Sequence, residues 1–237
     1  MKRIVEPELL DRLPAADPLA KHSRNDLVRL NAWMGNATIL SRPLQRLATV
    51  PHPRRLLDLG AGDGRFIWQV AKRLPCHWRG TVVELLDKQA DLSPQARRGL
   101  EDLGWQVRDL RADVSRFLAK TPDESWSGIC ANLFLHHFTE TELASLLRLI
   151  SERTGLFVAV EPRRSVWALI ASRMVGFIGC NRVTRHDAVT SVRAGFTANA
   201  LSVLWPNDGF WRLEEGRAGF FSHLFVARKN GLGSASE

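Results

Sequence analysis

Three glycines lie at alternate positions directly after a short apolar run, in the segment RRLLDLGAGDGRF (54–66). Glycine loses more backbone freedom on folding than any other residue, so this cluster indicates a tight turn or a backbone that a ligand approaches closely. The third glycine of the dinucleotide-binding pattern G-x-G-x-x-G would fall at Arg65, so the spacing does not fit that pattern. The candidate ligand-binding residues of this segment are Asp58, Gly60, Ala61, Gly62 and Gly64.

Further candidates follow later apolar runs. They are Asp87 in TVVELLD, with Glu84 as the alternative acid, Asp113 and Val114 in RADVSRF, and Asn132, His136 and His137 in ANLFLHHF. In a strand of period two, the last residue faces the cleft, which favours Asp87 and leaves Glu84 as the alternative. Imidazole titrates near neutral pH and can act as a general base, which adds His186 in the polar segment 181–196.

The elements that must position these residues alternate along the chain. From residue 54 onward, apolar strand patterns alternate with helical patterns, which is typical of a parallel sheet covered on both faces. FWRLEEG and GFFSHLFVAR lie close together and predict a terminal antiparallel hairpin. We therefore expect a doubly wound, Rossmann-like α/β fold with a mostly parallel seven-stranded sheet and an N-terminal helical extension. We expect three parts: a helical lid (1–50), the α/β domain (51–228) and a disordered tail (229–237).

The DLGAGDG segment with the acids after the next two strands resembles motif I and its neighbours in class I S-adenosylmethionine-dependent methyltransferases, over residues 54–228. The resemblance implies that S-adenosylmethionine is the cofactor, that Asp87 or Glu84 binds the ribose hydroxyls and that Asp113 meets the adenine. It implies a cofactor site formed by Asp58, Gly60, Ala61, Gly62, Gly64, Asp87, Asp113, Val114 and Asn132. Methyl transfer by SN2 displacement needs alignment and, for a protonated acceptor, a base, for which His137, His136 and His186 are the candidates.

Composition bears on the acceptor and the compartment. The net charge of +8 allows nucleic acid as a partner, but the basic residues are scattered, and the D/N-PP-[YFW] tetrapeptide of amino-group methylases is absent. A small, apolar aromatic or polyketide-like natural product is the expected acceptor; the alternatives are a nucleic-acid or protein methyltransferase and a non-catalytic regulatory protein. Three widely spaced cysteines suit a reducing cytoplasm and predict no metal site. Oligomeric state stays open.

The apolar segment 165–180 predicts a buried or surface-seeking helix. A spanning helix needs about 20 apolar residues, and this segment is shorter and contains Arg173, which leaves peripheral membrane contact open. Its apolar residues Trp167, Ile170, Met174 and Phe177 share one helix face, and we expect most of that face to pack on the sheet. We expect the stretch 181–196 to be irregular and, with His186 or Arg185, to cover the acceptor site.

Overall fold

The computed structural model describes residues 1–14, 16–49, 54–89, 92–206 and 208–231. Within these ranges, seven strands form one sheet in the order β3-β2-β1-β4-β5-β7-β6. The strands are β1 (Arg55–Leu59), β2 (Val82–Asp87), β3 (Gln106–Arg111), β4 (Gly128–Asn132), β5 (Leu156–Pro162), β6 (Trp211–Ala218) and β7 (Ser222–Lys229). Neighbouring strands from β3 to β5 pair in parallel, and β7 is antiparallel to both β5 and β6. This confirms the predicted doubly wound sheet with its terminal hairpin.

The strands divide their side chains between two apolar cores. In β1, Leu56 faces one core and Leu57 the other, because successive side chains of a strand point to opposite faces. The helices over the two faces are α3 (Asn36–Leu44), α4 (Arg65–Ala71) and α5 (Pro94–Asp102) on one side, and α6 (Val114–Lys120) and α7 (Glu140–Ser151) on the other. The start of α7 has a capping box formed by Thr139 and Glu142.

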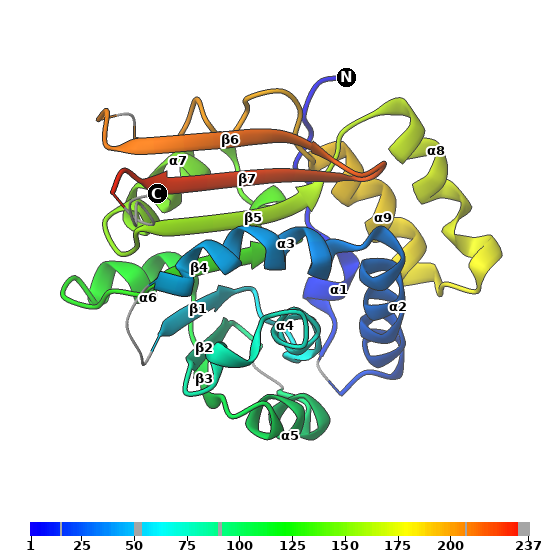
Figure 1. Cartoon of the computed structure of the whole chain (residues 1–237). Coiled ribbons are helices and arrows are strands. Elements are labelled where there is room, and N and C mark those ends of the chain that lie inside the picture. The colour runs from blue at the N-terminus through cyan, green and yellow to red at the C-terminus, as the bar shows by residue number, and fades with distance from the viewer. Residues whose placement is uncertain (15, 50–53, 90–91, 207, 232–237) are drawn as a thin grey trace.

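A cap of helices lies beyond the carboxyl ends of the parallel strands (Figure 1, right). It consists of α1 (Leu9–Arg12), α2 (Pro18–Met34), α8 (Val166–Met174), the short 3-10 helix η4 (Val175–Ile178) and α9 (Arg182–Ala194). Asp26 of α2 is fully buried and accepts hydrogen bonds from the Asn181 amide and the Thr184 hydroxyl. The N-terminal helices are therefore joined to α9 by a buried carboxylate.

Two expectations for the cap are wrong. The stretch 181–196 is largely the helix α9, which begins where the Asn181 side chain accepts from the Thr184 amide. Its buried face includes the polar residues Thr184, Asp187 and Thr190. The sequence therefore lacks the repeat of apolar residues every three to four positions that predicts a helix. The face of α8 expected to pack on the sheet is exposed instead: Trp167 is 78% and Phe177 is 87% exposed.

Smaller differences concern the element ends. The first helix after the glycine turn begins at Arg65, and residues 197–205 form turns without a regular helix. Lys229 belongs to β7, and residues 232–237 of the predicted tail lie outside the described residues. No helix in the described part of the chain has the length and apolar character needed to cross a bilayer.

Candidate active site

The glycine turn connects β1 to α4 at the carboxyl edge of the sheet. Gly60, Gly62 and Gly64 have φ of 68°, 55° and 75°, in the left-handed region that other residues rarely adopt. A Cβ on Gly60 would lie 2.3 Å from the ring of Phe134, so the turn also needs glycine there for close packing. No described atom lies within 4 Å of a Cβ placed on Gly62, which leaves the outer side of this turn open.

The two alternative acids of β2 lie in different surroundings. Asp87 ends β2, and its carboxylate accepts hydrogen bonds from the Gly62 amide at 3.0 Å and the Gln89 amide at 2.7 Å. Glu84 is buried and bonds to Arg55, Arg108 and the Trp126 indole. Asp87 therefore lies at the glycine turn, whereas Glu84 belongs to an ion-pair cluster.

Asp58 is a buried carboxylate without a cationic partner among the described residues. It is 2% exposed, and its hydrogen-bond partner is the Cys130 thiol at 3.5 Å. Burial raises the pKa of Asp58 to about 7, and the negative charge of Asp87 adds to this rise. A buried carboxylate with so little compensation fits a site that receives a cationic ligand, and the ammonium group of S-adenosylmethionine has that charge.

The remaining expected cofactor residues already have partners. Asp113 is the N-cap of α6, accepts from the Arg116 amide and pairs with Lys88 at 2.9 Å, and these contacts lower its pKa. The side chain of Val114 is buried in the core, and the amide of Asn132 bonds to Asn31 and Asn36 in the N-terminal helices. Asn132 thus connects the end of β4 to the cap.

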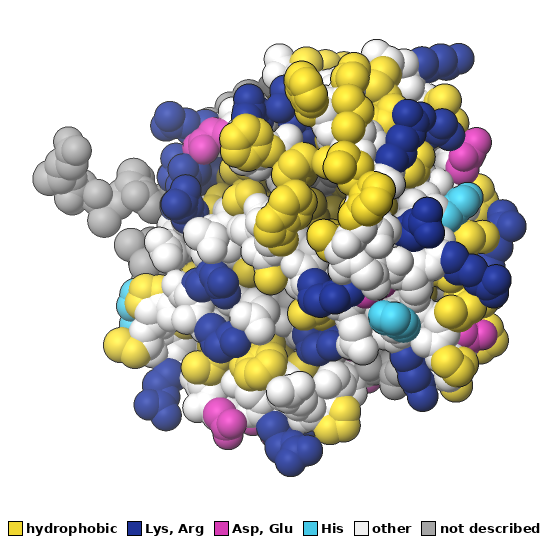
Figure 2. Space-filling model, turned by 90° about the vertical axis from the view of Figure 1, so that its right-hand side faces the viewer, with side chains coloured by type: hydrophobic (Ala, Val, Ile, Leu, Met, Phe, Trp, Pro, Cys, Tyr) yellow, Lys and Arg dark blue, Asp and Glu magenta, His cyan; other side chains and the backbone are white. Residues whose placement is uncertain are grey.

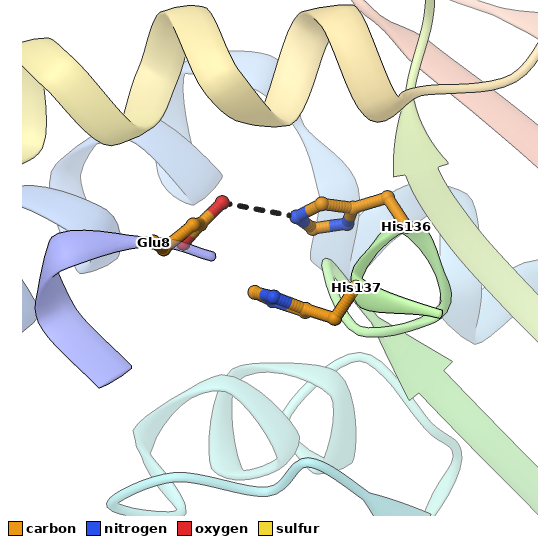
Figure 3. A group of neighbouring side chains, drawn as sticks. All are labelled: Glu8, His136 and His137. Carbon is orange, nitrogen blue, oxygen red and sulfur yellow. Dashed lines mark hydrogen bonds and ion pairs between the residues drawn. The ribbon is translucent and has the colours of Figure 1, made fainter. Parts of the chain in front are cut away.

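A buried triad of His136 and two carboxylates lies beyond β4. His136 Nδ1 is 2.8 Å from Glu161 of β5, and His136 Nε2 is 3.2 Å from Glu8, which precedes α1 (Figure 3). Burial alone would lower the pKa of His136, but the hydrogen bonds and charges of Glu161 and Glu8 raise it to about 9. His136 is therefore an imidazolium at neutral pH.

Glu161 also fixes the loop that carries the histidines. Its Oε1 accepts hydrogen bonds from the Phe134 and Leu135 amides at 3.0 and 2.8 Å. Leu133 in this loop has a backbone φ of 52°, which is strained for a residue that carries a Cβ. One buried carboxylate thus holds both the loop backbone and His136.

The pKa of His137 is shifted in the opposite direction to that of His136. Its ring lies 4.3 Å from that of His136, and its Nδ1 is 3.4 Å from Asp11. Burial lowers the pKa of His137, and the positive charge of His136 lowers it further. His137 is therefore neutral at pH 7, with a ring nitrogen that can accept a proton.

Glu8, His136 and His137 also offer three ligand atoms within 4.8 Å of one another. To hold a divalent cation, His136 would have to release the proton that it shares with Glu8, and its pKa of about 9 opposes this at neutral pH. The geometry therefore favours a hydrogen-bonded triad over a metal centre, and the absence of a metal stays a prediction.

The N-terminal segment is anchored over this triad. The Asp187 carboxylate of α9 accepts from the Leu9 and Leu10 amides at 2.8 and 2.9 Å, which caps the start of α1. The Arg3 guanidinium donates to the Phe138 carbonyl at 2.9 Å. No local sequence pattern points to Glu8, so its role could not be predicted from the sequence. Glu161 could have been found, because it is an acid within the otherwise apolar run GLFVAVEP.

A cavity of about 100 Å³ lies between α2, α8 and α9, next to the triad. Its apolar lining includes Leu27, Leu30, Trp33, Met34, Ala171 and Val175. Its polar lining includes Glu8, Glu161, Thr184, Asp187 and Ser191. His186 and Arg185 lie on the other side of α9, in an exposed hollow with Arg173 and Arg182, so the structure does not bring His186 to the histidine pair.

The triad predicts a specific dependence of stability on pH. A folded-state pKa of about 9 against a usual value of 6.5 corresponds to about 3 kcal/mol of unfolding free energy, fully present below pH 6.5 and lost as the pH rises through 9. In thermal unfolding, the midpoint should fall more between neutral pH and about pH 10 in the wild type than in His136→Gln. His77→Gln, which changes an exposed histidine, should keep the wild-type dependence. Equal falls in all three proteins would contradict an imidazolium at position 136.

Residues 56–154 match a protein family described as a methyltransferase domain. Comparison with curated protein sequences gives no match.

Solved structures of methyltransferases share the fold. The plantazolicin methyltransferase BamL, in complex with a triazolic desmethylPZN analog and S-adenosylhomocysteine (SAH), has a TM-score of 0.64 at 14% identity, covering 93% of both chains. The plantazolicin methyltransferase BpumL with SAH has a TM-score of 0.63 at 14% identity, covering 91% of this chain and 92% of that one. Magnesium protoporphyrin IX methyltransferase (ChlM) from Synechocystis PCC 6803 with SAH has a TM-score of 0.54 at 12% identity, covering 91% and 88%. Residues 56–154 thus carry a methyltransferase domain, and over nine-tenths of its length the chain has the fold of methyltransferases solved with bound S-adenosylhomocysteine.

Proposed function

We propose that this enzyme methylates a small apolar molecule, aromatic or polyketide-like, that binds in the cavity between α2, α8 and α9. The observation that carries the proposal is this cavity, whose walls are mostly apolar and whose polar lining includes Glu8 and Glu161, the two carboxylates that bind His136. Pockets for small molecules typically combine apolar walls with a few placed polar groups. The similarity to plantazolicin methyltransferases supports an acceptor from natural-product chemistry.

The cofactor side of the site is assigned to the glycine turn and its acids. The bound cofactor supplies an electrophilic methyl group. Asp87 would accept hydrogen bonds from the two ribose hydroxyls, and Asp58 would compensate the ammonium group at the buried edge of β1. The N-terminal helices α1 and α2 would act as the lid, because they close the cavity and bond to the end of β4.

His137 is the favoured general base because of its protonation state. A base must be unprotonated at the working pH, and His137 meets this requirement because its pKa is lowered, whereas His136 does not. His136 would act as a positioning residue that holds Glu8 and the lid over the site. Asp11, 3.4 Å from His137, can stabilise the imidazolium formed when the acceptor loses its proton.

The first prediction for this function compares the two acids of β2. Asp87→Ala should weaken SAH binding by roughly 10- to 100-fold, because a charged hydrogen-bond acceptor contributes about 1.5–3 kcal/mol. Glu84→Ala removes the partner of Arg55 and Arg108, so it should lower the unfolding midpoint and keep SAH affinity within severalfold. Calorimetric titration and thermal unfolding measure both effects; a larger affinity loss in Glu84→Ala would reverse the assignment.

Because the pKa of Asp58 is raised, we expect cofactor affinity to depend on pH. Only the ionised carboxylate attracts an ammonium group, so SAH affinity should rise from about pH 6 to about pH 8 as Asp58, with a pKa of about 7, loses its proton. The rise approaches about tenfold per pH unit below the pKa. In Asp58→Asn the affinity should be lower and nearly flat across this range. A flat wild-type profile would remove Asp58 from the cofactor site.

The acceptor cavity is tested by two neighbouring residues of α9. Ala188 lines the cavity and Val189 faces the outer hollow. Ala188→Phe should fill the cavity and raise the KM for a hydrophobic phenol by about tenfold or more, with SAH affinity unchanged. Val189→Phe is the matched control and should leave both values unchanged. The assay follows labelled methyl transfer from S-adenosylmethionine to phenols of increasing apolar area.

The same assay separates binding from chemistry. His137→Gln should retain SAH affinity and lower kcat by about 10²–10⁴-fold, the usual contribution of a general base. Unchanged turnover in both Ala188→Phe and His137→Gln would place the acceptor site elsewhere. Methylation of RNA or protein substrates in preference to every phenol would overturn the proposed acceptor class.

A further inference from the structure

The outer side of α8 and η4 forms an exposed apolar face. The α8–η4 face consists of Val166, Trp167, Ile170, Met174, Phe177 and Ile178. These side chains are between 42% and 87% exposed, although they are among the most apolar residues of the chain. Figure 2 shows hydrophobic side chains gathered on the side of the molecule where α8 lies. Contiguous apolar surface of this kind marks an interaction site.

The opposite side of α8 is apolar as well. Ala168, Ala171 and Val175 face inward and line the acceptor cavity. Most surface helices pair an apolar face with a polar one, whereas α8 presents apolar side chains both to the cavity and outward. The outward residues do not line the cavity, so closing the cavity does not explain why they are apolar. Their apolar side chains would be stabilised by a partner surface that removes them from water.

Positive charge lies directly beside this face. Arg173 of α8 borders an exposed hollow of about 320 Å³ together with Arg182, Arg185 and His186 of α9. Arg185 also packs against η4, since a Cβ on Gly176 would lie 2.8 Å from its Nε. Across the described residues, none of these three arginines forms an ion pair with an acid. The chain as a whole carries a net charge of +8.

Aromatic residues extend the apolar surface to the cavity. Trp33 of α2 is 67% exposed and stacks on Phe221, with ring centroids 5.1 Å apart. Both residues line the acceptor cavity, as does the inner side of α8. The cavity therefore reaches the surface at Trp33, and inner residues of α8 form part of its wall.

We propose that the α8–η4 face docks on an anionic lipid bilayer. Phe177, Ile178 and Trp167 would enter the boundary between headgroups and acyl chains, and the arginines would meet lipid phosphates. The nine residues of α8 reach about 14 Å, too short to span a bilayer, so the contact is interfacial. A second copy of this chain fits this face less well. In a symmetric dimer the arginines of the two copies would lie close together, and their like charges would repel. Docking does not depend on the acceptor class proposed above.

The test is sedimentation with lipid vesicles. The full chain should sediment with vesicles of equal parts phosphatidylcholine and phosphatidylglycerol, and much less with phosphatidylcholine alone. The double variant Trp167→Glu/Phe177→Glu should lose this binding. The matched control Val203→Glu/Phe210→Glu adds the same charge at exposed apolar residues outside α8 and η4, and should bind like the wild type. Each arginine changed to glutamine at positions 173, 182 and 185 should weaken binding by roughly fivefold.

SAH titration of every variant separates a failure of docking from a failure of folding. The docking variants should retain wild-type SAH affinity, because none of the changed residues lines the cavity or the glycine turn. Wild-type protein that stays in solution with anionic vesicles would overturn the proposal. A concentration-dependent dimer in light scattering that Trp167→Glu/Phe177→Glu dissociates would also overturn it and assign the face to a second copy of the chain.

Discussion

A buried histidine held between two carboxylates determines how the cap meets the sheet. A charge removed from water is stable only when partners compensate it, and His136 finds these partners in Glu161 of β5 and Glu8 ahead of α1. Glu8 therefore cannot move away without leaving His136 with a single carboxylate. The same segment is held by Asp187, whose carboxylate caps α1 from α9. The cap is thus held by compensated buried charges as well as by apolar packing.

The glycine turn and the apolar cavity differ in charge. Asp58 and Asp87 place negative charge around a turn whose outer side is open at Gly62. The cavity is lined mostly by apolar side chains, and its polar lining includes Glu8 and Glu161, the two partners of His136. Burial and the positive charge of His136 both lower the pKa of His137, so two adjacent histidines of the same loop differ in charge at neutral pH.

Local signals made most of the fold predictable from the sequence. The strands and the glycine turn each depend on residues close together in the chain, and both are found as predicted. Contacts between distant segments were not predictable in this way. No residue near Glu8 in the sequence indicates that it bonds to His136. In α9, several buried residues are polar, so the helical spacing of its buried face cannot be recognised from apolar residues. For α8, periodicity showed which residues share a face and could not show that the face remains uncovered.

The contacts of the first residues constrain the order in which the protein folds. Ile4 donates a hydrogen bond to the carbonyl of Arg193, and Glu8 bonds to Ser191, so these N-terminal residues pair with a helix more than 180 residues further along the chain. During translation the amino-terminal segment emerges first, and its partners in α9 leave the ribosome only after β1 to β5. Its docking closes a loop of most of the chain and is a late, non-local step. The N-terminal part of the cap is consequently completed after β1 to β5, and a chain that ends before α9 would leave the amino terminus without these partners.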